Sequence, residues 1–183
     1  NPDRLKAVIG EAIASSDLVI TTGGLGPTDD DLTKETVAEL LGLPLVHDGE
    51  AEENIRARLR GRPMSPGNLK QAQLPQGSCT LYNSCGTAPG AIIEKDSCAV
   101  VMLPGVPQEM REMFLHSVIP YIKEQPKSLR LRNGREPRGR GARRSDVGRK
   151  SDARAVLQER RNKTEDQRKS AERSGGGGND RVA

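Results

Sequence analysis

The sequence is poor in aromatic residues and in apolar residues generally. Tryptophan is absent, 2% of the 183 residues are aromatic, and 33% are hydrophobic, whereas an ordinary globular domain is nearer half apolar. No apolar run approaches the ~18 residues of a membrane span, so we expect no transmembrane helix. The cysteines Cys79, Cys85 and Cys98 are too few for a complete disulfide framework. This favours a reducing compartment and predicts a cytoplasmic protein.

The charge is distributed unevenly along the chain. Residues 1–125 hold 11 Lys+Arg and 17 Asp+Glu, a net of −6, whereas residues 126–183 hold 18 Lys+Arg and 8 Asp+Glu, a net of +10. The basic second part contains no aromatic residue and few large aliphatic ones, too few to offset the entropy of folding. We therefore predict a folded domain over residues 1–125 and a basic, low-complexity, disordered tail over residues 126–183. The acidic domain argues against a specific nucleic-acid partner.

Helix and strand signals alternate through residues 1–125. Apolar residues recur at helical spacing after Asn1-Pro2, a good cap and first turn, and the apolar run Leu18–Ile20 predicts a buried strand. Further helices are expected over 32–41, 49–59 and 107–123, with a Pro/Gly break at 63–67. Further strands are expected over 80–83, 91–94 and 98–103. This order, with a loop following each buried strand, predicts an α/β fold with three layers, α/β/α.

The densest chemistry lies directly after the first predicted strand. Thr22-Gly23-Gly24-Leu25-Gly26 is followed by Asp29, Asp30 and Asp31. Glycines after a strand let backbone N–H groups approach an anion. Carboxylates beside such a loop would repel a phosphate unless a divalent cation lay between them, and oxygen ligands suit Mg²⁺ or Mn²⁺. The alternative, left open by the residues alone, is a helix start enriched in aspartate.

Two other loops follow or precede predicted strands. Gly86–Gly90 lies between two strand signals, and by itself is typical of a β-turn. Residues 103–110 connect a strand to a helix and place Glu109 in the first helical turn. In α/β sheets, ligands bind at the carboxyl ends of strands. We therefore expect the loops after residues 22 and 103 to share one crevice.

These segments resemble a known family. The glycine loop with Asp31 and Thr33 resembles the signature of the MoaB/MogA molybdopterin-binding superfamily, and residues 1–125 are similar to the N-terminal domain of the CinA (competence/damage-inducible) family. The segments that carry the resemblance are Thr21–Thr33 with Glu35, Asn68–Ala72 with Leu74-Pro75, Asn83 with Gly86–Gly90, and Leu103–Met110 with Met113. The resemblance implies a molybdopterin-binding-like α/β/α fold and a metal-dependent ADP-ribose pyrophosphatase activity.

The resemblance also implies roles for individual residues. Asp31 and Glu109 are the candidate catalytic residues, and Asp31 is the candidate ligand of a divalent metal ion (Mg, Mn or Co). Lys70 either reaches the ligand or fixes its own segment. The candidate ligand-binding residues are Thr22, Gly23, Gly24, Gly26, Thr28, Thr33, Glu35, Lys70, Gly86, Thr87 and Gly105.

The sequence departs from the family pattern at both ends. The family's first strand and its Asp-Thr-Asn motif, which contributes a carboxylate to the same pocket, would precede Asn1. We therefore expect an incomplete copy, and whether it is active stays open. Residues 126–183 do not match the family, but a shifted reading frame turns 131–136 and 150–158 into strings that resemble its next segments. We interpret the tail as frameshifted. The alternative is a genuine basic tail that binds nucleic acid or an anionic membrane.

Three functions remain open at this point. The first is a CinA-like hydrolase that cleaves a nucleotide pyrophosphate of the ADP-ribose type with a divalent metal. The second is a pterin-binding or transfer module of molybdenum-cofactor biosynthesis. The third is a non-catalytic remnant that acts as a binding or oligomerisation unit. The expected partner is a nucleotide or pterin-phosphate small molecule, without a membrane, and a homo-oligomer is compatible with each reading.

Overall fold

The computed structural model describes residues 1–96 and 98–124. The predicted disorder and frameshift of residues 126–183 therefore lie outside the described residues. The elements follow in chain order: α1 (Pro2–Ser15), β1 (Leu18–Thr22), α2 (Thr33–Leu40), β2 (Leu45–His47), α3 (Gly49–Leu59), α4 (Pro66–Gln71), β3 (Gln73–Pro75), β4 (Cys79–Leu81), β5 (Gly90–Lys95), β6 (Cys98–Leu103), α5 (Pro107–Met113), the π-helical turn η1 (Phe114–Val118) and α6 (Ile119–Glu124).

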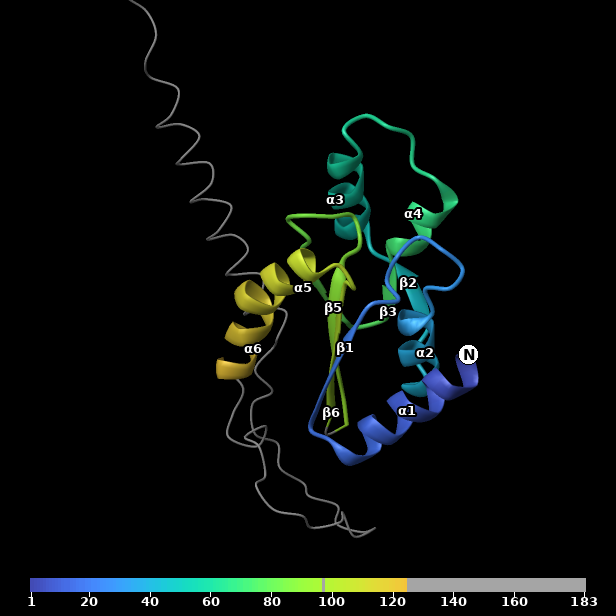
Figure 1. Cartoon of the computed structure of the whole chain (residues 1–183), viewed down its shortest axis with the longest axis vertical. Coiled ribbons are helices and arrows are strands. Elements are labelled where there is room, and N and C mark those ends of the chain that lie inside the picture. The colour runs from blue at the N-terminus through green and yellow to red at the C-terminus, as the bar shows by residue number, and fades with distance from the viewer. Residues whose placement is uncertain (97, 125–183) are drawn as a thin grey trace, which may run out of the picture. The chain divides into compact units, whose positions relative to one another are not determined.

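A four-stranded sheet forms the centre of the domain, in the order β1-β6-β5-β4. β1 runs parallel to β6, whereas β5 is antiparallel to both β6 and β4. All six residues of β6 are buried, as its continuous apolar run predicts for a central strand. Helices α1 and α2 lie on one side of this sheet and α5 and α6 on the other (Figure 1). The predicted three-layer α/β/α arrangement is confirmed.

Local signals in the sequence account for several element boundaries. The side chain of Asn1 accepts a hydrogen bond from the backbone N–H of Arg4 at 3.2 Å, and so caps α1. Asp48 caps α3 in the same way, through the N–H of Ala51 at 2.9 Å. Gly42, two residues beyond α2, adopts a positive φ of 61°, which permits the turn that ends this helix.

The segment between α3 and β4 contains structure that the sequence analysis missed. The sequence predicted no helix or strand there, only a Pro/Gly break at residues 63–67. In the structure, Ser65 and Asn68 form a capping box that starts α4. β3 then pairs antiparallel with β2 in a separate two-stranded sheet. β2 and β3 have three residues each, too few to show an alternating pattern, and neither was predicted, whereas the equally short β4 was predicted over 80–83.

The closing helix is interrupted, although one helix was predicted over residues 107–123. The N–H of Ile119 donates to the carbonyl of Phe114, five residues back, and this makes the π-helical turn η1. Pro120 follows and has no N–H to continue the α-helical pattern. The wider turn therefore lies where a proline would otherwise distort the helix.

Three loops meet at one edge of the sheet. β1 and β6 are parallel and end together, with Thr22 paired to Leu103. β5 is antiparallel to β6, and its first residues pair near the end of β6, Ala91 with Met102. The loops after β1, after β6 and before β5 consequently lie at the same edge, where ligands of α/β proteins bind.

Candidate functional site

The glycine loop after β1 is shaped by close contacts with its surroundings. Gly23 and Gly24 have positive φ values of 92° and 72°, which side-chain-bearing residues rarely adopt. The N–H of Gly23 donates to the carbonyl of Leu103 at 2.9 Å, and the N–H of Thr33 donates to the carbonyl of Gly24 at 3.2 Å. A Cβ on Gly24 would overlap the Thr33 side chain. These two glycines therefore fix the loop between β6 and the start of α2.

Asp31 turns back over the same loop. Its Oδ2 accepts hydrogen bonds from the backbone N–H of Thr28 at 3.1 Å and from the Thr28 hydroxyl at 2.5 Å. A Cβ on Gly26 would overlap the Asp31 carboxylate, so glycine is required there. Partial desolvation acts to raise the pKa of Asp31, but the hydrogen bonds from Thr28 and Gly26 and the charge of Lys70 lower it overall. Asp31 is thus held in its anionic form.

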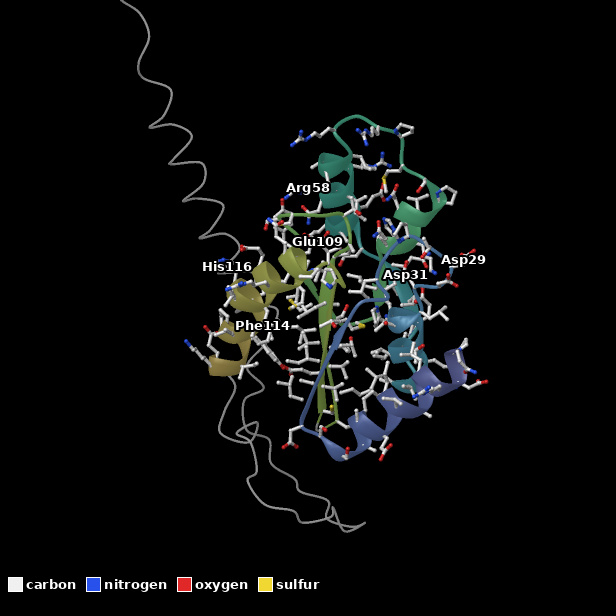
Figure 2. All side chains as sticks on the ribbon, viewed as in Figure 1. Asp29, Asp31, Arg58, Glu109, Phe114 and His116 are labelled. Atoms are coloured by element: carbon white, nitrogen blue, oxygen red, sulfur yellow. The ribbon has the colours of Figure 1, made fainter. Side chains whose placement is uncertain are left out.

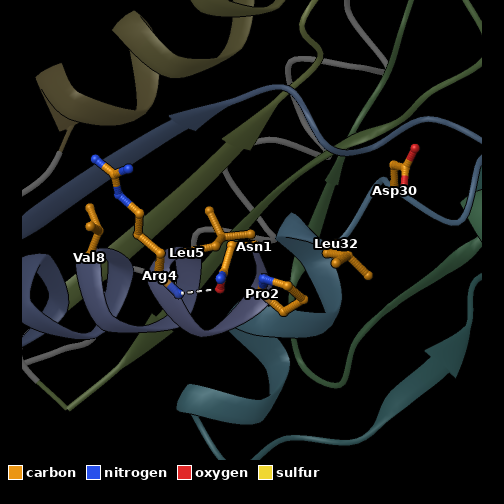
Figure 3. Close-up of a pocket in the computed structure, with 7 residues that line it drawn as sticks. All are labelled: Asn1, Pro2, Arg4, Leu5, Val8, Asp30 and Leu32. Atoms are coloured by element: carbon orange, nitrogen blue, oxygen red, sulfur yellow. Dashed lines mark hydrogen bonds between the residues drawn. The ribbon is translucent and has the colours of Figure 1, made fainter.

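The three consecutive aspartates face different surroundings. Asp31 lines the main pocket described below. Asp29 is exposed on the outer side of the loop (Figure 2). Asp30 instead borders a second depression, of about 390 Å³, between the loop and the start of α1. Figure 3 shows this depression with Arg4, Leu5 and Asp30 around it.

Lys70 of helix α4 supports the aspartate loop without lining the pocket. The Lys70 ammonium donates to the backbone carbonyls of Thr28 at 3.1 Å and Asp31 at 3.3 Å, and lies 3.5 Å from Glu35 Oε1. The buried Lys34 ammonium donates to the Lys70 carbonyl at 2.6 Å, and burial lowers the pKa of Lys34 to about 8. Lys70 and Glu35 therefore hold the loop in place.

A second group of contacts fixes Glu109 on the opposite side. Asn83, buried just after β4, donates through Nδ2 to Glu109 Oε2 at 2.7 Å. A Cβ on Gly86 would overlap the Glu109 carboxyl group. Gly105 likewise approaches Gly23 so closely that a Cβ there would lie 3.2 Å from the Gly23 Cα. The three loops therefore contact one another through glycines.

A pocket of about 330 Å³ lies between these loops. Two carboxylates, Asp31 and Glu109, reach it from different loops, and among the described residues none of its lining side chains is cationic. We take this pocket, rather than the larger depression at α1, as the candidate site because polar groups converge on it at the strand ends. Its lining comprises Gly23–Pro27, Asp31, Gln71, Thr87, Ala88, Pro104–Val106 and Glu109.

The structure divides the predicted site residues into two groups. Seven of them line the pocket: Asp31, Glu109, Gly23, Gly24, Gly26, Thr87 and Gly105. The others lie outside the lining. Thr28, Thr33, Glu35, Lys70 and Gly86 contact or support the lining residues, and Thr22 ends β1. The chemical roles predicted for all of these residues stay predictions.

Two polar residues at the site were missed or given no role. Gln71 is 1% exposed, lines the pocket and donates to the Leu25 carbonyl at 3.4 Å. Asn83 was noted only within the family motif. Asn83 is 5% exposed, and a buried amide requires hydrogen-bond partners, but this burial is visible only in the structure.

The donor chemistry fits a magnesium-type cation, although the described residues contain no group of three or more His, Cys, Asp or Glu side chains arranged to hold a metal. Mg²⁺ is commonly held by one or two carboxylates together with substrate phosphates and water. Asp31 and Glu109, which line one pocket, could supply such a partial ligand set. A closed, all-protein metal cage is not what this arrangement provides.

The α/β/α layers and the glycine-bordered pocket define a small-molecule-binding α/β domain, and comparison with known proteins places it in a family. The chain belongs to the family described as "Probable molybdopterin binding domain", which matches residues 1–124. This confirms the resemblance found in the sequence at the level of the superfamily.

The relatives specify the resemblance further. A competence-damage inducible protein of Thermoanaerobacter pseudethanolicus is 52% identical over 127 residues, which cover 68% of this chain and 31% of the relative. A CinA-like protein of Trichormus variabilis is 48% identical over 128 residues, with the same coverage. The chain thus spans about a third of the length of these relatives, and the resemblance to the CinA family is confirmed.

A solved structure agrees with the fold. The crystal structure of CinA from Thermoplasma acidophilum, described as a protein of unknown function, has a TM-score of 0.60 and 36% sequence identity. The match covers 63% of this chain and 68% of that one. Within the part of the chain that the structure describes, no helix has both the length and the hydropathy to cross a membrane.

Proposed function

We propose that the pocket binds a nucleotide pyrophosphate of the ADP-ribose type and hydrolyses it with a divalent cation. The observation that carries this proposal is the pairing of Asp31 and Glu109 in a glycine-lined pocket without a cationic lining side chain. A pyrophosphate entering such a pocket would be repelled by both carboxylates. A divalent cation bound with it would remove that repulsion, polarise the phosphoryl oxygens and make water a better nucleophile.

The residues of this chain then have separate tasks. Asp31, held anionic by Thr28, would hold the cation. Glu109 would accept the proton of the attacking water. Water attacks one phosphorus of the pyrophosphate and the bridging P–O bond breaks, so that ADP-ribose and water give AMP and ribose 5-phosphate. The glycine loops let the phosphates approach the backbone closely.

Pterin binding is the second candidate, and the family description favours it. The pocket wall contains the apolar residues Leu25, Pro104 and Val106, and Val106 remains 52% exposed. A flat heterocycle could contact such a wall while its phosphate lay against the glycines. The same contacts would serve the adenine of ADP-ribose, so hydrolysis is what separates the two candidates.

The test uses the 183-residue chain. We expect AMP to be released from ADP-ribose with Mg²⁺, Mn²⁺ or Co²⁺, and release to stop when EDTA is added. Binding of a pterin phosphate should be measured in parallel by calorimetry. Tight pterin binding without AMP release under any of the three metals would refute hydrolysis and favour the pterin-binding module. The absence of both would contradict the proposed pocket.

A further inference from the structure

Asn83 uses its whole hydrogen-bonding capacity within the site. It is 5% exposed, and its Oδ1 accepts from the N–H of Cys85 at 2.9 Å and of Gly86 at 2.7 Å. Its Nδ2 donates to the carbonyl of Ala88 at 2.8 Å and to Glu109 Oε2 at 2.7 Å. A primary amide has two donors and two acceptor sites, and all four are used here.

The partners determine which way this amide faces. Two backbone N–H groups surround one end of it, and a carbonyl and a carboxylate surround the other. A flipped amide would point its NH₂ at two donors and its oxygen at two acceptors, and four bonds would be lost. The amide orientation of Asn83 is therefore fixed, with its NH₂ group donating to Glu109.

Glu109 does not make the hydrogen bond that its position in α5 favours. It is the third residue of α5, and a glutamate at that position often reaches back to the backbone at the start of its own helix. The cap residue of α5, Val106, makes no side-chain capping bond. The hydrogen bond of Glu109 goes instead to Asn83, 26 residues earlier, while Gly86 leaves room for its carboxylate.

We propose that Asn83 is a positioning residue whose amide holds the Glu109 carboxylate in the pocket and ties it to the turn of residues 84–88. This inference rests on the proposed function, because it assigns to Asn83 the orientation of the group that accepts the proton from water. Thr87 and Ala88 of the same turn line the pocket, so one buried amide fixes both a pocket wall and a reacting group.

The test is a double-mutant cycle built on substitutions that preserve shape. Asn83→Asp keeps the oxygen that accepts from Cys85 and Gly86, but it replaces the Nδ2 donor with a second carboxylate oxygen. It therefore loses the bonds to Glu109 and to the Ala88 carbonyl, and the loss at Ala88 is the same in both Glu109 backgrounds. Glu109→Gln alone keeps an acceptor for Asn83. The double variant pairs a carboxylate at position 83 with an amide at position 109, which restores a donor and an acceptor in reversed order. Asn54→Asp, on α3 and outside the pocket lining, is the control for the added charge.

The first readout is the folding equilibrium measured by urea denaturation. We expect Asn83→Asp to lower the folding equilibrium constant, and Glu109→Gln to recover at least about tenfold of that loss when the two are combined. For the control, the loss in the folding equilibrium constant caused by Asn54→Asp should be the same with Glu109 and with Glu109→Gln. Equal losses in the two Glu109 backgrounds would show that the residues do not interact, and would overturn the proposal.

The second readout separates positioning from a structural role. Asn83→Asp should lower kcat for ADP-ribose by at least about tenfold with a change in KM of less than about threefold, and it should lower kcat no further in the Glu109→Gln background. Independent losses of kcat would mean that Asn83 does not act through Glu109, and would overturn the proposal. If the wild-type chain neither binds nor cleaves ADP-ribose, the proposed function fails, and the folding cycle alone decides whether Asn83 holds Glu109.

Discussion

Replacing Asp31 with asparagine distinguishes between two roles of this residue: a ligand of the metal ion, or a loop residue that only stabilises a turn. Asparagine keeps the shape and one oxygen acceptor for the Thr28 groups that now bond Asp31 Oδ2 at 2.5 and 3.1 Å. It removes the charge that a divalent cation requires. Because Asp31 is partly exposed, we expect the lost charge-assisted bonds to cost only about 1 kcal/mol of unfolding free energy.

The expected effect on catalysis is larger. Losing a direct metal ligand should lower turnover well over tenfold, which is more than about 1.4 kcal/mol of transition-state stabilisation. Asp29→Asn makes the same chemical change two residues away on an exposed side chain, and should leave turnover within about twofold. The measurements are AMP release from ADP-ribose and Mn²⁺ affinity by electron paramagnetic resonance, for the wild type and both variants.

The pH dependence of stability supplies an independent check. The pKa of Asp31 is lowered from its ordinary value of 3.8 in the folded chain, so its contribution is present above that value and is lost as the pH falls through the folded pKa. Asp31→Asn should weaken this acid-induced loss. If Asp31→Asn keeps wild-type turnover and Mn²⁺ affinity while melting slightly lower, Asp31 is only a turn residue and the site assignment is wrong.

Three further substitutions test other parts of the structure. Gly86→Ala places a Cβ on the Glu109 carboxyl group and should reduce turnover at least about tenfold. Gly49→Ala is the control, because Gly49 has open space around it, and should leave turnover unchanged. Equal activities of the two variants would contradict the packing described. Tyr121→Phe removes the 2.6 Å hydrogen bond from α6 to a carboxylate of β5 and should cost about 1 kcal/mol in urea denaturation; an unchanged midpoint would show that water replaces it. The pKa of Lys34 falls from 10.5 to about 8 on folding, so the unfolded chain binds more protons between these pH values. The free energy of unfolding should therefore rise with pH across that window. Lys34→Met should flatten this rise, and parallel curves of unfolding free energy against pH for the two proteins would refute it.

The sequence predicted those parts of the fold that depend on local patterns. The bounds of α3 and β6 were predicted as the structure has them, because a cap residue marks the first and a continuous apolar run marks the second. The π-helical turn at Phe114–Val118 was not predicted. The apolar spacing from 107 to 123 is the same on either side of it, and only Pro120 hints at an interruption.

The candidate site shows the same division between local and distant signals. Asp31 and its glycines lie within one loop, so their clustering is visible in the sequence and they do line the pocket. Glu109 is also found in the lining, because β1 and β6 are parallel and end together. The role of Asn83 could not be derived in this way, since its bond to Glu109 crosses 26 residues.

The support of the glycine loop shows why local patterns are insufficient for this site. Gly23 and Gly24 are bonded to β6 and to the start of α2, whereas the stretch from Thr28 to Asp31 that follows them requires a further restraint. The restraint comes from Lys70, whose ammonium bonds the carbonyls of Thr28 and Asp31 from positions 42 and 39 residues away. Lys70 also stands beside Glu35, so a cation on α4 joins the aspartate loop to α2. Lys70, for which the sequence left open whether it reaches the ligand or fixes its own segment, therefore supports the loop that carries the predicted chemistry.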